Sequence, residues 1–401
     1  MKICMFAKGL PVHVIGGLEL HTQFLTEKLT ERGHDVTVIT TKHPKGLRSD
    51  NINGVKIYYV GDKSLKYTEN FFKESYELFK RLNTDENFDV VHSQSTSGYG
   101  FVKYSKIEKP FVTTMHGIMK NEIASIMNEG GLKNWLVIPY LFFKYVTNIK
   151  KRDMCSLQAS KKIISDSKEL KNDLIKEYRI PEEKITIIYD GIDVNKFKPA
   201  TVDDFRKKLR IEKDEKIILS SGRIVKQKGY HLIVQILPEI LKEMKVRLII
   251  VGDGDYLQHL KDLVRKRNIS NNVLFTGKVS EQDLIKYYNL ADVFVFPTLR
   301  VEAFGIVIAE AMSCGKPVVA TKVGGIQTVV DDSENGYLIE MNNLKELKER
   351  LMMVFSDEKL AKKLGNAARK KVVENFSLEK MIDDTIKVYE EVANENRRKS
   401  L

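Results

Sequence analysis

Two glutamates eight residues apart, Glu302 and Glu310, lie on either side of a change from a strand-like run to a helix-like run. They belong to the stretch EAFGIVIAEA, which follows the apolar run VFVFP. The unpaired backbone N–H groups at the start of a helix favour an anion such as a phosphate. A carboxylate facing outward beside them is placed to accept hydrogen bonds from hydroxyl groups. The stretch indicates a ligand with a phosphate and sugar hydroxyls, and an ordinary amphipathic helix with solvated glutamates is the alternative.

A pair of cations occurs in the loop SGRIVKQKG (221–229), directly after the strand-like run IILS. Arg223 and Lys228 would emerge from one strand end, and two fixed cations suit a diphosphate. Each charge-assisted hydrogen bond of this kind contributes about 1.5–3 kcal/mol. The alternative is a pair of ordinary surface cations.

Glycines and a histidine also follow predicted strands. Gly16 and Gly17 precede the helix-like run LELHTQFLTEKL, where glycine lets the backbone approach a ligand and the helix start favours an anion. The spacing G-x-G-x-x-G of a dinucleotide site is absent from this loop. His116 ends the run FVTTMH, where an imidazole can donate a hydrogen bond or carry a proton, or serve as a core histidine.

The stretch VGDGDYLQHL (251–260) is open to two interpretations. Asp253 and Asp255 form a D-x-D pattern, which could hold a metal-bound sugar nucleotide. A turn after a buried strand explains the same residues. Tyr256 and Leu257 stand where a dinucleotide motif would need its third glycine.

Short apolar runs alternate with amphipathic helix-like runs along most of the chain. This alternation predicts parallel sheets covered on both faces by helices. Two series separated by a polar stretch that ends at Lys216 predict two doubly wound domains, facing each other across a cleft at the carboxyl ends of their strands. A last helix is expected from Ser377 to Val392, followed by a frayed end. The strand-like runs are 3–7, 36–40, 55–60, 89–93, 111–116, 162–167 and 184–193 in the first series, and 217–223, 246–254, 272–277, 293–298 and 317–325 in the second.

Composition excludes several classes of protein. The three cysteines lie far apart without a C-x-x-C spacing, so neither a disulfide framework nor a zinc site is indicated, and a reducing cytosol is expected. The first apolar run is too short for a signal peptide, and WLVIPYLFFKYV (135–146) is too short to span a bilayer.

Half of the net charge of +12 comes from one segment of the chain. Residues 131–171 hold nine Lys or Arg against three acidic residues, next to an aromatic-rich run. Such a mixture is typical of surfaces that bind anionic lipid, and a solvated pair of basic helices is the alternative. No nucleic-acid-binding motif accompanies the charge, so a nucleic-acid partner is not expected.

Taken together and in this order, seven stretches resemble glycosyltransferase family 4, whose members have the two-domain GT-B fold. The resemblance runs from about residue 2 to residue 392, and EAFGIVIAEA is its most specific part. It implies a nucleotide-sugar donor, retention of anomeric configuration and chemistry without a metal or other cofactor. The stretches are GGLELHT, TMHG, YDGIDVNKF, SGRIVKQKG, VGDGDYLQHL, EAFGIVIAEAM and KVGGIQTVV.

The resemblance also implies roles for residues. Arg223 and Lys228 would hold the donor diphosphate, which Gly16 and Gly17 would approach from the N-terminal domain. His116 would lie beside the transferred sugar and assist the reaction. Glu302 would accept hydrogen bonds from donor-sugar hydroxyls, and Glu310 would bind the ribose hydroxyls. Backbone amides of Phe304, Gly305 and Ile306 would lie near the sugar and phosphate, and Ile224, Val279 and Leu284 would flank the base.

The implied domains are an N-terminal acceptor-side domain, 1–194, completed by a returning helix, 377–401, and a C-terminal nucleotide-sugar-binding domain, 195–376. The sequence departs from the family pattern at Asp190, where asparagine is usual. Residues 118–150 match nothing specific, as expected for a segment that contacts the acceptor.

The resulting hypothesis is a retaining hexosyltransferase that uses a UDP- or GDP-sugar and a hydroxyl acceptor, which could be lipid-linked or a glycan, in the synthesis of cell-surface glycoconjugates or polysaccharides. Front-side attack is favoured because no carboxylate is evidently placed as a nucleophile. The expected location is cytoplasmic, with peripheral attachment to the inner face of the membrane as an option. The alternatives are a non-catalytic sugar-nucleotide-binding protein and a GT-B epimerase or phosphorylase. A dinucleotide-dependent oxidoreductase is excluded by the glycine spacing.

Overall fold

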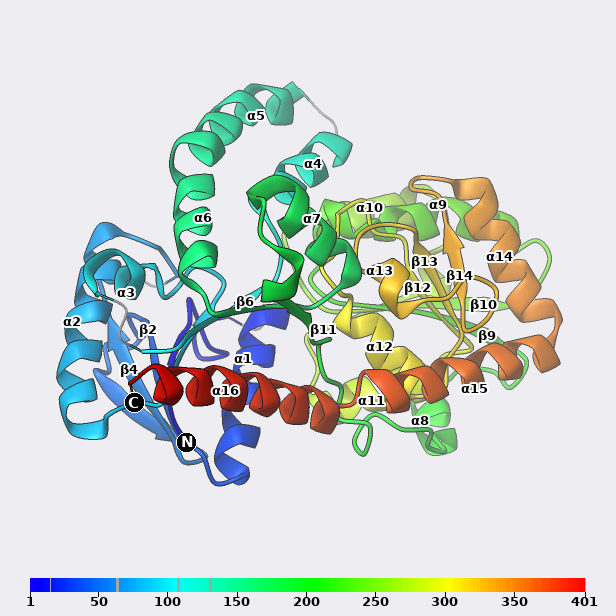
Figure 1. Cartoon of the computed structure of the whole chain (residues 1–401). Coiled ribbons are helices and arrows are strands. Elements are labelled where there is room, and N and C mark those ends of the chain that lie inside the picture. Colours follow the sequence, from blue (N-terminus) through cyan, green and yellow to red (C-terminus); the bar gives the residue numbers. More distant parts are fainter. Residues whose placement is uncertain (15, 63–64, 107–108, 130–131, 401) are drawn as a thin grey trace. The chain divides into compact units, whose positions relative to one another are not determined.

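The computed structural model describes residues 1–14, 16–62, 65–106, 109–129 and 132–400. Gly131, where the predicted basic segment begins, and Leu401, where the predicted last helix ends, lie outside these residues. The chain forms two compact units, each built around its own sheet (Figure 1). Unit 1 comprises residues 1–119, 141–191 and 379–401, and unit 2 comprises residues 120–140 and 192–378.

The sheet of unit 1 has eight strands in the order β3-β4-β2-β1-β5-β6-β7-β8. All neighbouring strands are parallel except the edge pair β3 and β4. The chain winds outward from β1 in one direction and then from β5 in the other, so the strand order reverses between them. Loops at such a switch point commonly hold ligands. The strands are β1 (Lys2–Phe6), β2 (Asp35–Thr41), β3 (Ser49–Ile52), β4 (Val55–Val60), β5 (Val90–Gln94), β6 (Phe111–Met115), β7 (Lys162–Ser165) and β8 (Ile185–Ile187).

The sheet of unit 2 has six parallel strands in the order β11-β10-β9-β12-β13-β14. Its core is aliphatic, with Ile218, Leu248 and Val295 fully buried on the central strands. Burial on both faces explains why these strands read as continuous apolar runs. The strands are β9 (Lys216–Ser221), β10 (Val246–Val251), β11 (Val273–Gly277), β12 (Val293–Phe296), β13 (Val318–Thr321) and β14 (Tyr337–Ile339).

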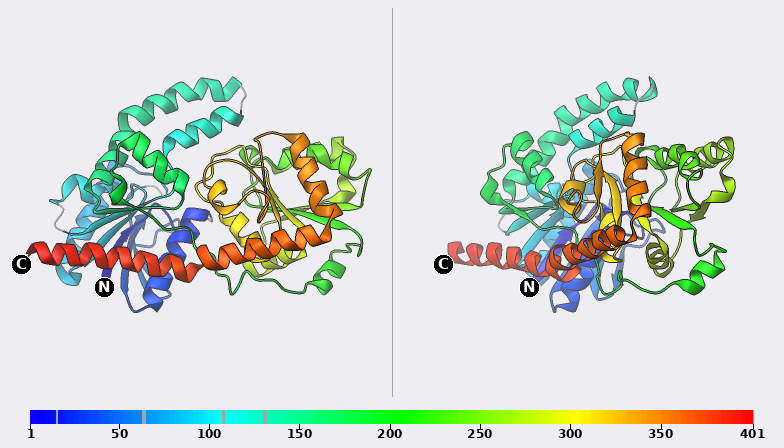
Figure 2. Two further views of the ribbon diagram at one scale, coloured as in Figure 1. Left: turned by 45° about the vertical axis from the view of Figure 1, so that its right-hand side comes forward. Right: turned by 90° about the vertical axis from the view of Figure 1, so that its right-hand side faces the viewer.

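Helices pack against both sheets, as the turned views show (Figure 2). A π-helical turn, η1, joins α5 to α6, and 3₁₀ turns precede three later elements. No helix in the described part of the chain combines the length and apolarity needed to cross a bilayer. The helices are α1 (Gly17–Glu31), α2 (Glu69–Glu86), α3 (Tyr99–Tyr104), α4 (Met119–Glu129), α5 (Leu132–Lys144), η1 (Tyr145–Ile149), α6 (Lys150–Ala159), α7 (Lys168–Tyr178), η2 (Glu182–Lys184), α8 (Asp203–Lys208), η3 (Lys226–Lys228), α9 (Tyr230–Ile240), α10 (Leu257–Lys266), η4 (Ser270–Asn272), α11 (Glu281–Leu290), α12 (Ile306–Ser313), α13 (Ile326–Val329), α14 (Leu344–Ser356), α15 (Glu358–Asn375) and α16 (Leu378–Ser400).

Three strands differ from the sequence-based expectation. β3 reads SDNI and lies antiparallel at the sheet edge with three exposed residues, so it carries no apolar signal. β14 is buried but only three residues long. The run 184–193 forms a strand only over Ile185–Ile187. Hydrophobic patterning finds buried strands well and polar or very short edge strands poorly.

The C-terminal helix α16 packs within unit 1. Tyr389 and His92 are fully buried, and the Tyr389 Oη atom lies 2.6 Å from His92 Nδ1. Farther along, an Arg397 guanidinium nitrogen lies 3.4 Å from an Asp89 carboxylate oxygen. The expected fraying of residues 394–400 is wrong, because α16 stays helical through Ser400 and makes contacts beyond Val392.

Replacing Tyr389 by Phe should destabilise unit 1. Burial lowers the pKa of His92 to about 3, so its ring is neutral and hydrogen-bonds to Tyr389 and Thr114. Losing the phenol leaves a buried ring nitrogen unpaired, which costs about 1–3 kcal/mol. Urea unfolding of Tyr389→Phe measures the loss, and Lys387→Ala on the exposed face of α16 should leave stability nearly unchanged. Equal stabilities of Tyr389→Phe and the unchanged protein would contradict the assignment.

Candidate functional site

The loop between β12 and α12 holds Glu302 against a cation from the neighbouring strand end. Lys228 Nζ donates to Glu302 Oε1 at 2.8 Å, and the two side chains are only 17% and 15% exposed. Thr298 Oγ1 lies 3.3 Å from the same oxygen. Burial alone would raise the pKa of Glu302, but the charge and hydrogen bond of Lys228 outweigh it and hold that pKa below its usual value. The site therefore presents a carboxylate that stays ionised at neutral pH.

Close backbone packing fixes this loop from two sides. Gly325 N donates to Glu302 O at 2.8 Å, and a Cβ at Gly325 would lie 1.7 Å from Ala303 O. Gly229 has a φ of +72°, and a Cβ there would lie 1.8 Å from Pro297 O. Side chains at either glycine would push the loop away, so glycine is required for the approach.

The start of α12 lies directly beyond Glu302. Gly305 is the N-cap residue with a φ of +101° and offers no side-chain cap to the first amides of the helix. Helix-start amides without a cap are suited to bind an anion. Phe304 contributes only backbone to this turn, because its side chain is buried against Phe376 with ring centroids 5.2 Å apart. Ile306 is the first residue of the helix.

Glu310 lies one helical turn farther along, in a different environment from Glu302. Tyr288 Oη donates to Glu310 Oε2 at 2.6 Å and lies 2.9 Å from Ser221 Oγ. Burial raises the pKa of Glu310 to about 7, although the hydrogen bond from Tyr288 opposes this shift. Glu310 thus titrates near neutral pH, whereas Glu302 does not.

The two predicted cations occupy different positions. Lys228 ends η3 and lies with its ammonium 4.8 Å from the centre of the Phe296 ring. Arg223 is exposed on the same loop, just after β9. Ile224 is fully buried in the core of unit 2, so the expectation that its side chain flanks a base is not met here.

Residues 120–126 of α4 contact the loop of Glu302, which sequence reasoning missed. Val301 N donates to Ser125 Oγ at 3.0 Å, and Arg300 forms an ion pair with Glu122. Nothing in the sequence signals these contacts, since α4 lies far from the loop along the chain and matches no motif.

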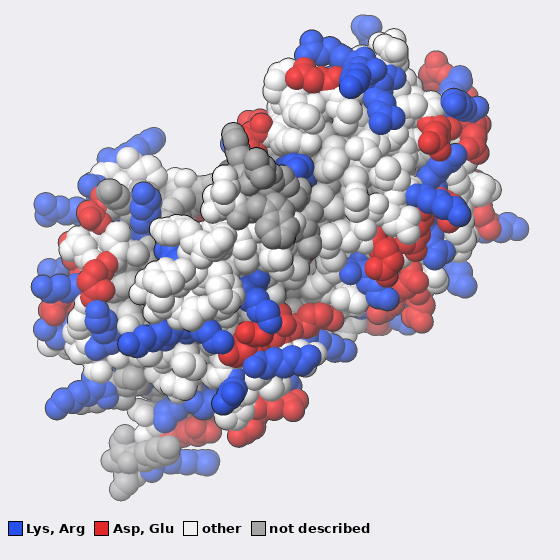
Figure 3. Space-filling model, turned by 90° about the horizontal axis from the view of Figure 1, so that it is seen from above, with Lys and Arg blue, Asp and Glu red and all other residues white. Residues whose placement is uncertain are grey.

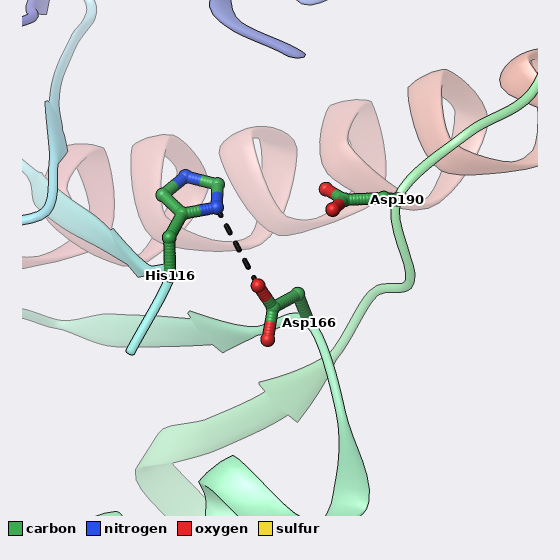
Figure 4. A group of neighbouring side chains, drawn as sticks. All are labelled: His116, Asp166 and Asp190. Carbon is green, nitrogen blue, oxygen red and sulfur yellow. Dashed lines mark ion pairs between the residues drawn. The ribbon is translucent and has the colours of Figure 1, made fainter. Parts of the chain in front are cut away.

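In unit 1, His116 lies where β6 ends, within a buried group of polar side chains (Figure 4). Its Nε2–H donates to Gln94 Oε1 at 2.7 Å, and its ring meets that of His21 edge-on with centroids 4.7 Å apart. Its Nδ1 lies 3.5 Å from Asp166 Oδ2. Burial lowers the pKa of His116, so the ring is neutral at physiological pH with its Nδ1 facing Asp166.

The pKa values of two aspartates in this group shift in opposite directions. Burial and the charge of Asp190 raise the pKa of Asp166 well above its usual value. Burial also acts to raise the pKa of Asp190, but His21 overcomes it and lowers that pKa, with Nδ1 only 2.7 Å from Asp190 Oδ1. The aspartate that replaces the usual asparagine is thus the partner of a histidine from α1. Asp166, His21 and Gln94 were not predicted, although each lies at or near the carboxyl edge of the sheet.

A cation could in principle be held here. His116, Asp166 and Asp190 bring one ligand atom each within 4.8 Å of one another, and in the described part of the chain no other such group was found. Imidazole and carboxylate ligands suit several divalent metals. Asp253 serves a turn instead, since its Oδ1 accepts from Gly254 N at 2.8 Å. The absence of a metal cofactor stays a prediction.

Gly16 and Gly17 form the entry to α1, as the sequence suggested. Gly16 is the N-cap residue in an extended conformation, and Gly17 begins the helix. The carboxylate of Glu19 folds over Gly16, because a Cβ at Gly16 would lie 2.6 Å from Glu19 Oε2. These glycines and His116 belong to unit 1, and the other predicted site residues belong to unit 2.

Removing the cation of the Lys228–Glu302 pair should destabilise unit 2. Lys228→Met leaves a mostly buried carboxylate without its hydrogen-bonded partner, which should cost about 1–3 kcal/mol in urea unfolding. The double variant Lys228→Met/Glu302→Gln should lose less than the sum of the single losses, because it leaves no unpaired charge. Additive losses would show that the two side chains do not stabilise each other.

Comparisons with known proteins agree with this architecture. Residues 15–196 match the family model described as Glycosyltransferase Family 4, and residues 201–371 match the model described as Glycosyl transferases group 1. An uncharacterized glycosyltransferase of Methanocaldococcus jannaschii is 31% identical over 399 residues, which cover 97% of this chain and 98% of the relative.

Solved structures show the same fold at lower identity. A sucrose-phosphate synthase from Thermosynechococcus elongatus has a TM-score of 0.80 at 23% identity, with 98% of each chain covered. HepE of Anabaena, solved with UDP-glucose, has a TM-score of 0.72 at 20% identity, covering 98% of this chain and 100% of HepE. The fold is therefore GT-B, with two Rossmann-like domains, and the chain belongs to glycosyltransferase family 4.

Proposed function

We propose that this glycosyltransferase moves a hexosyl group from a UDP- or GDP-sugar to a hydroxyl acceptor in the synthesis of cell-surface glycoconjugates or polysaccharides. The observation that carries the proposal is the ionised Glu302, paired with Lys228 beside the uncapped start of α12. This arrangement places three groups at one edge of the sheet: a carboxylate that can accept hydrogen bonds from hydroxyls, a cation, and backbone amides suited to bind an anion. The complex of HepE with UDP-glucose supports a nucleotide-sugar donor.

In unit 2 each proposed role follows from the charge of the side chain. Arg223 and Lys228 stabilise the departing diphosphate, as a metal does in other transferases. Glu302 accepts hydrogen bonds from hydroxyls of the transferred sugar, and Glu310 accepts them from the ribose. The backbone amides of Phe304, Gly305 and Ile306 lie near the sugar and phosphate.

In unit 1 we propose that His116 lies beside the transferred sugar. The backbone of Gly16 and Gly17 approaches the diphosphate. The hydrogen bond to Gln94 fixes the ring of His116, so it is a preoriented neutral group. The acceptor hydroxyl attacks the anomeric carbon on the face that the phosphate leaves. The carbon–phosphate oxygen bond breaks as the new glycosidic bond forms, and the hydroxyl proton passes to the leaving phosphate. This route retains configuration and needs no metal.

Replacing Glu302 and replacing Glu310 should impair different steps, the transfer of the sugar and the binding of the nucleotide. Glu302→Gln should lower kcat by about 10²–10³ while nucleotide affinity changes little, because its contacts strengthen with the transferring sugar. Glu310→Gln should chiefly weaken nucleotide binding. Donor screening by thermal shift with UDP-, GDP- and ADP-glucose selects the nucleotide, since a ligand of the folded state raises Tm.

Transfer is then assayed in EDTA with the selected donor. Full turnover by Glu302→Gln would refute the proposed role of Glu302 in binding the transferred sugar. A requirement for Mg²⁺ would contradict the metal-free route. Donor binding without transfer to any hydroxyl acceptor would favour a non-catalytic binding protein. Conversion of the free sugar nucleotide to its 2-epimer would identify an epimerase.

Nucleotide affinity should increase as pH rises from 6 to 8. Because burial raises the pKa of Glu310 to about 7, its carboxyl is largely protonated at pH 6 and must ionise to accept two ribose hydrogen bonds. One proton linked to binding corresponds to about a tenfold change in Kd per pH unit below that pKa. Calorimetric titration of UDP measures the trend, and Glu310→Gln retains only the titration of the phosphate itself. Identical pH profiles for both proteins would exclude Glu310 as the group responsible.

A further inference from the structure

Helix α5 carries an exposed apolar face. Leu136, Tyr140 and Phe143 recur at intervals of four and three residues, so they lie on one side of the helix. Their exposed fractions are 74%, 64% and 66%. Three large apolar side chains so exposed on one helix are unusual in a water-soluble domain and indicate a surface that something covers.

The opposite face of α5 is apolar as well. Ile138 and Leu141 are half-buried and Tyr145, just beyond the helix, is buried, at the spacing of an inward face. A surface helix normally presents charged or polar residues on its outer side. Residues 136–143 contain no charge at all, and Val137 and Phe142 between the two faces are also exposed. The inward face already accounts for packing, so the outward face serves something else.

Charge nearby identifies the chemistry of what covers this face. Lys144 at the end of α5 and Lys151 in α6 are exposed. Figure 3, which views the molecule from the side that carries α5, shows a broad uncharged area whose border holds Lys and Arg as well as Asp and Glu side chains. Apolar and aromatic residues next to lysines suit an interface between hydrocarbon and anionic headgroups.

Only part of the basic charge in residues 131–171 is available to a partner. Lys162 pairs with Glu391 and Lys171 with Glu182, each at 2.9 Å. Arg152 lies over the ring of Tyr67, 5.1 Å from its centre. The apolar face must therefore contribute most of the binding, and the remaining lysines assist it.

We propose that α5 docks onto a phospholipid bilayer containing anionic lipid, with Leu136, Tyr140 and Phe143 inserted among the headgroups. The helix is 13 residues long and includes Pro139, whereas a span needs about 20 apolar residues, so α5 lies along the surface. The purpose of this docking rests on the proposed function, because a bilayer-bound transferase would take a lipid-linked hydroxyl acceptor.

The chain provides its own reporter for this docking. Its one tryptophan, Trp135, lies in α5 next to Leu136. Adding phosphatidylcholine vesicles that contain phosphatidylglycerol should shift tryptophan emission to shorter wavelength, and brominated lipid should quench it. Flotation of the full-length protein with the same vesicles measures the bound fraction.

Variants separate the apolar contribution from the charged one. Leu136→Ser/Tyr140→Ser/Phe143→Ser should lower vesicle partition by at least about tenfold. Lys144→Glu/Lys151→Glu should weaken binding only to vesicles that contain phosphatidylglycerol. The matched control is Met353→Ser/Val373→Ser, which changes two apolar side chains that are each 41% exposed in unit 2 and should leave partition unchanged.

Each outcome decides the proposal. Unchanged flotation of the triple variant, or no emission change with vesicles, would overturn it. The proposal would also be overturned if light scattering showed that the unchanged protein is a dimer, that the triple variant is a monomer, and that neither protein binds vesicles. Donor binding is measured separately by thermal shift without lipid, where the triple variant should match the unchanged protein and thereby show that it folds. Vesicle binding without any nucleotide-sugar binding would refute the proposed function and leave the docking surface standing.

Discussion

The ion pair between Lys228 and Glu302 is the interaction on which the site of unit 2 depends. It joins the loop after β9 to the loop after β12, two strands that are neighbours in the sheet. Without this partner, burial would raise the pKa of the Glu302 carboxyl, and a protonated acid is a poorer hydrogen-bond acceptor than a carboxylate. The close glycine contacts behind both loops keep the charges at hydrogen-bonding distance, so backbone shape and charge state support each other.

Unit 1 also buries acidic side chains, but it stabilises them in a different way. Two aspartates close together in a buried cluster cannot both ionise without a large penalty. His21, beside Asp190, lowers the pKa of that aspartate, whereas burial and the charge of Asp190 raise the pKa of Asp166 beside His116. His116 is then neutral with both ring nitrogens facing polar partners. The substitution of aspartate for asparagine at position 190 is therefore compatible with the site, since its charge is directed at a histidine of the same unit.

The sequence predicted the α/β fold, and it placed Gly16, Arg223 and Glu302 in loops that follow strands, because those signals are local. Continuous apolar runs predict buried parallel strands, and the candidate site residues follow them directly. Contacts that depend on distant segments were not predictable: the pairing of His21 with Asp190, the contact of Ser125 with Val301, and the burial of Ile224. The apolar run in α5 was visible in the sequence, but an apolar run is equally consistent with a core helix. Only the structure shows that its two faces have different exposure.

Residues 118–150 connect features that would otherwise be independent. The same segment lacks the family motifs, exposes the apolar face of α5 and, through α4, holds the backbone of Val301 next to Glu302. A displacement of Ser125 would remove the partner of the Val301 backbone N–H, one residue before Glu302. Within unit 2, the position of α4 and the position of the loop that carries Glu302 are therefore linked by hydrogen bonds. The segment without family motifs is thus physically coupled, through α4, to the loop that carries Glu302.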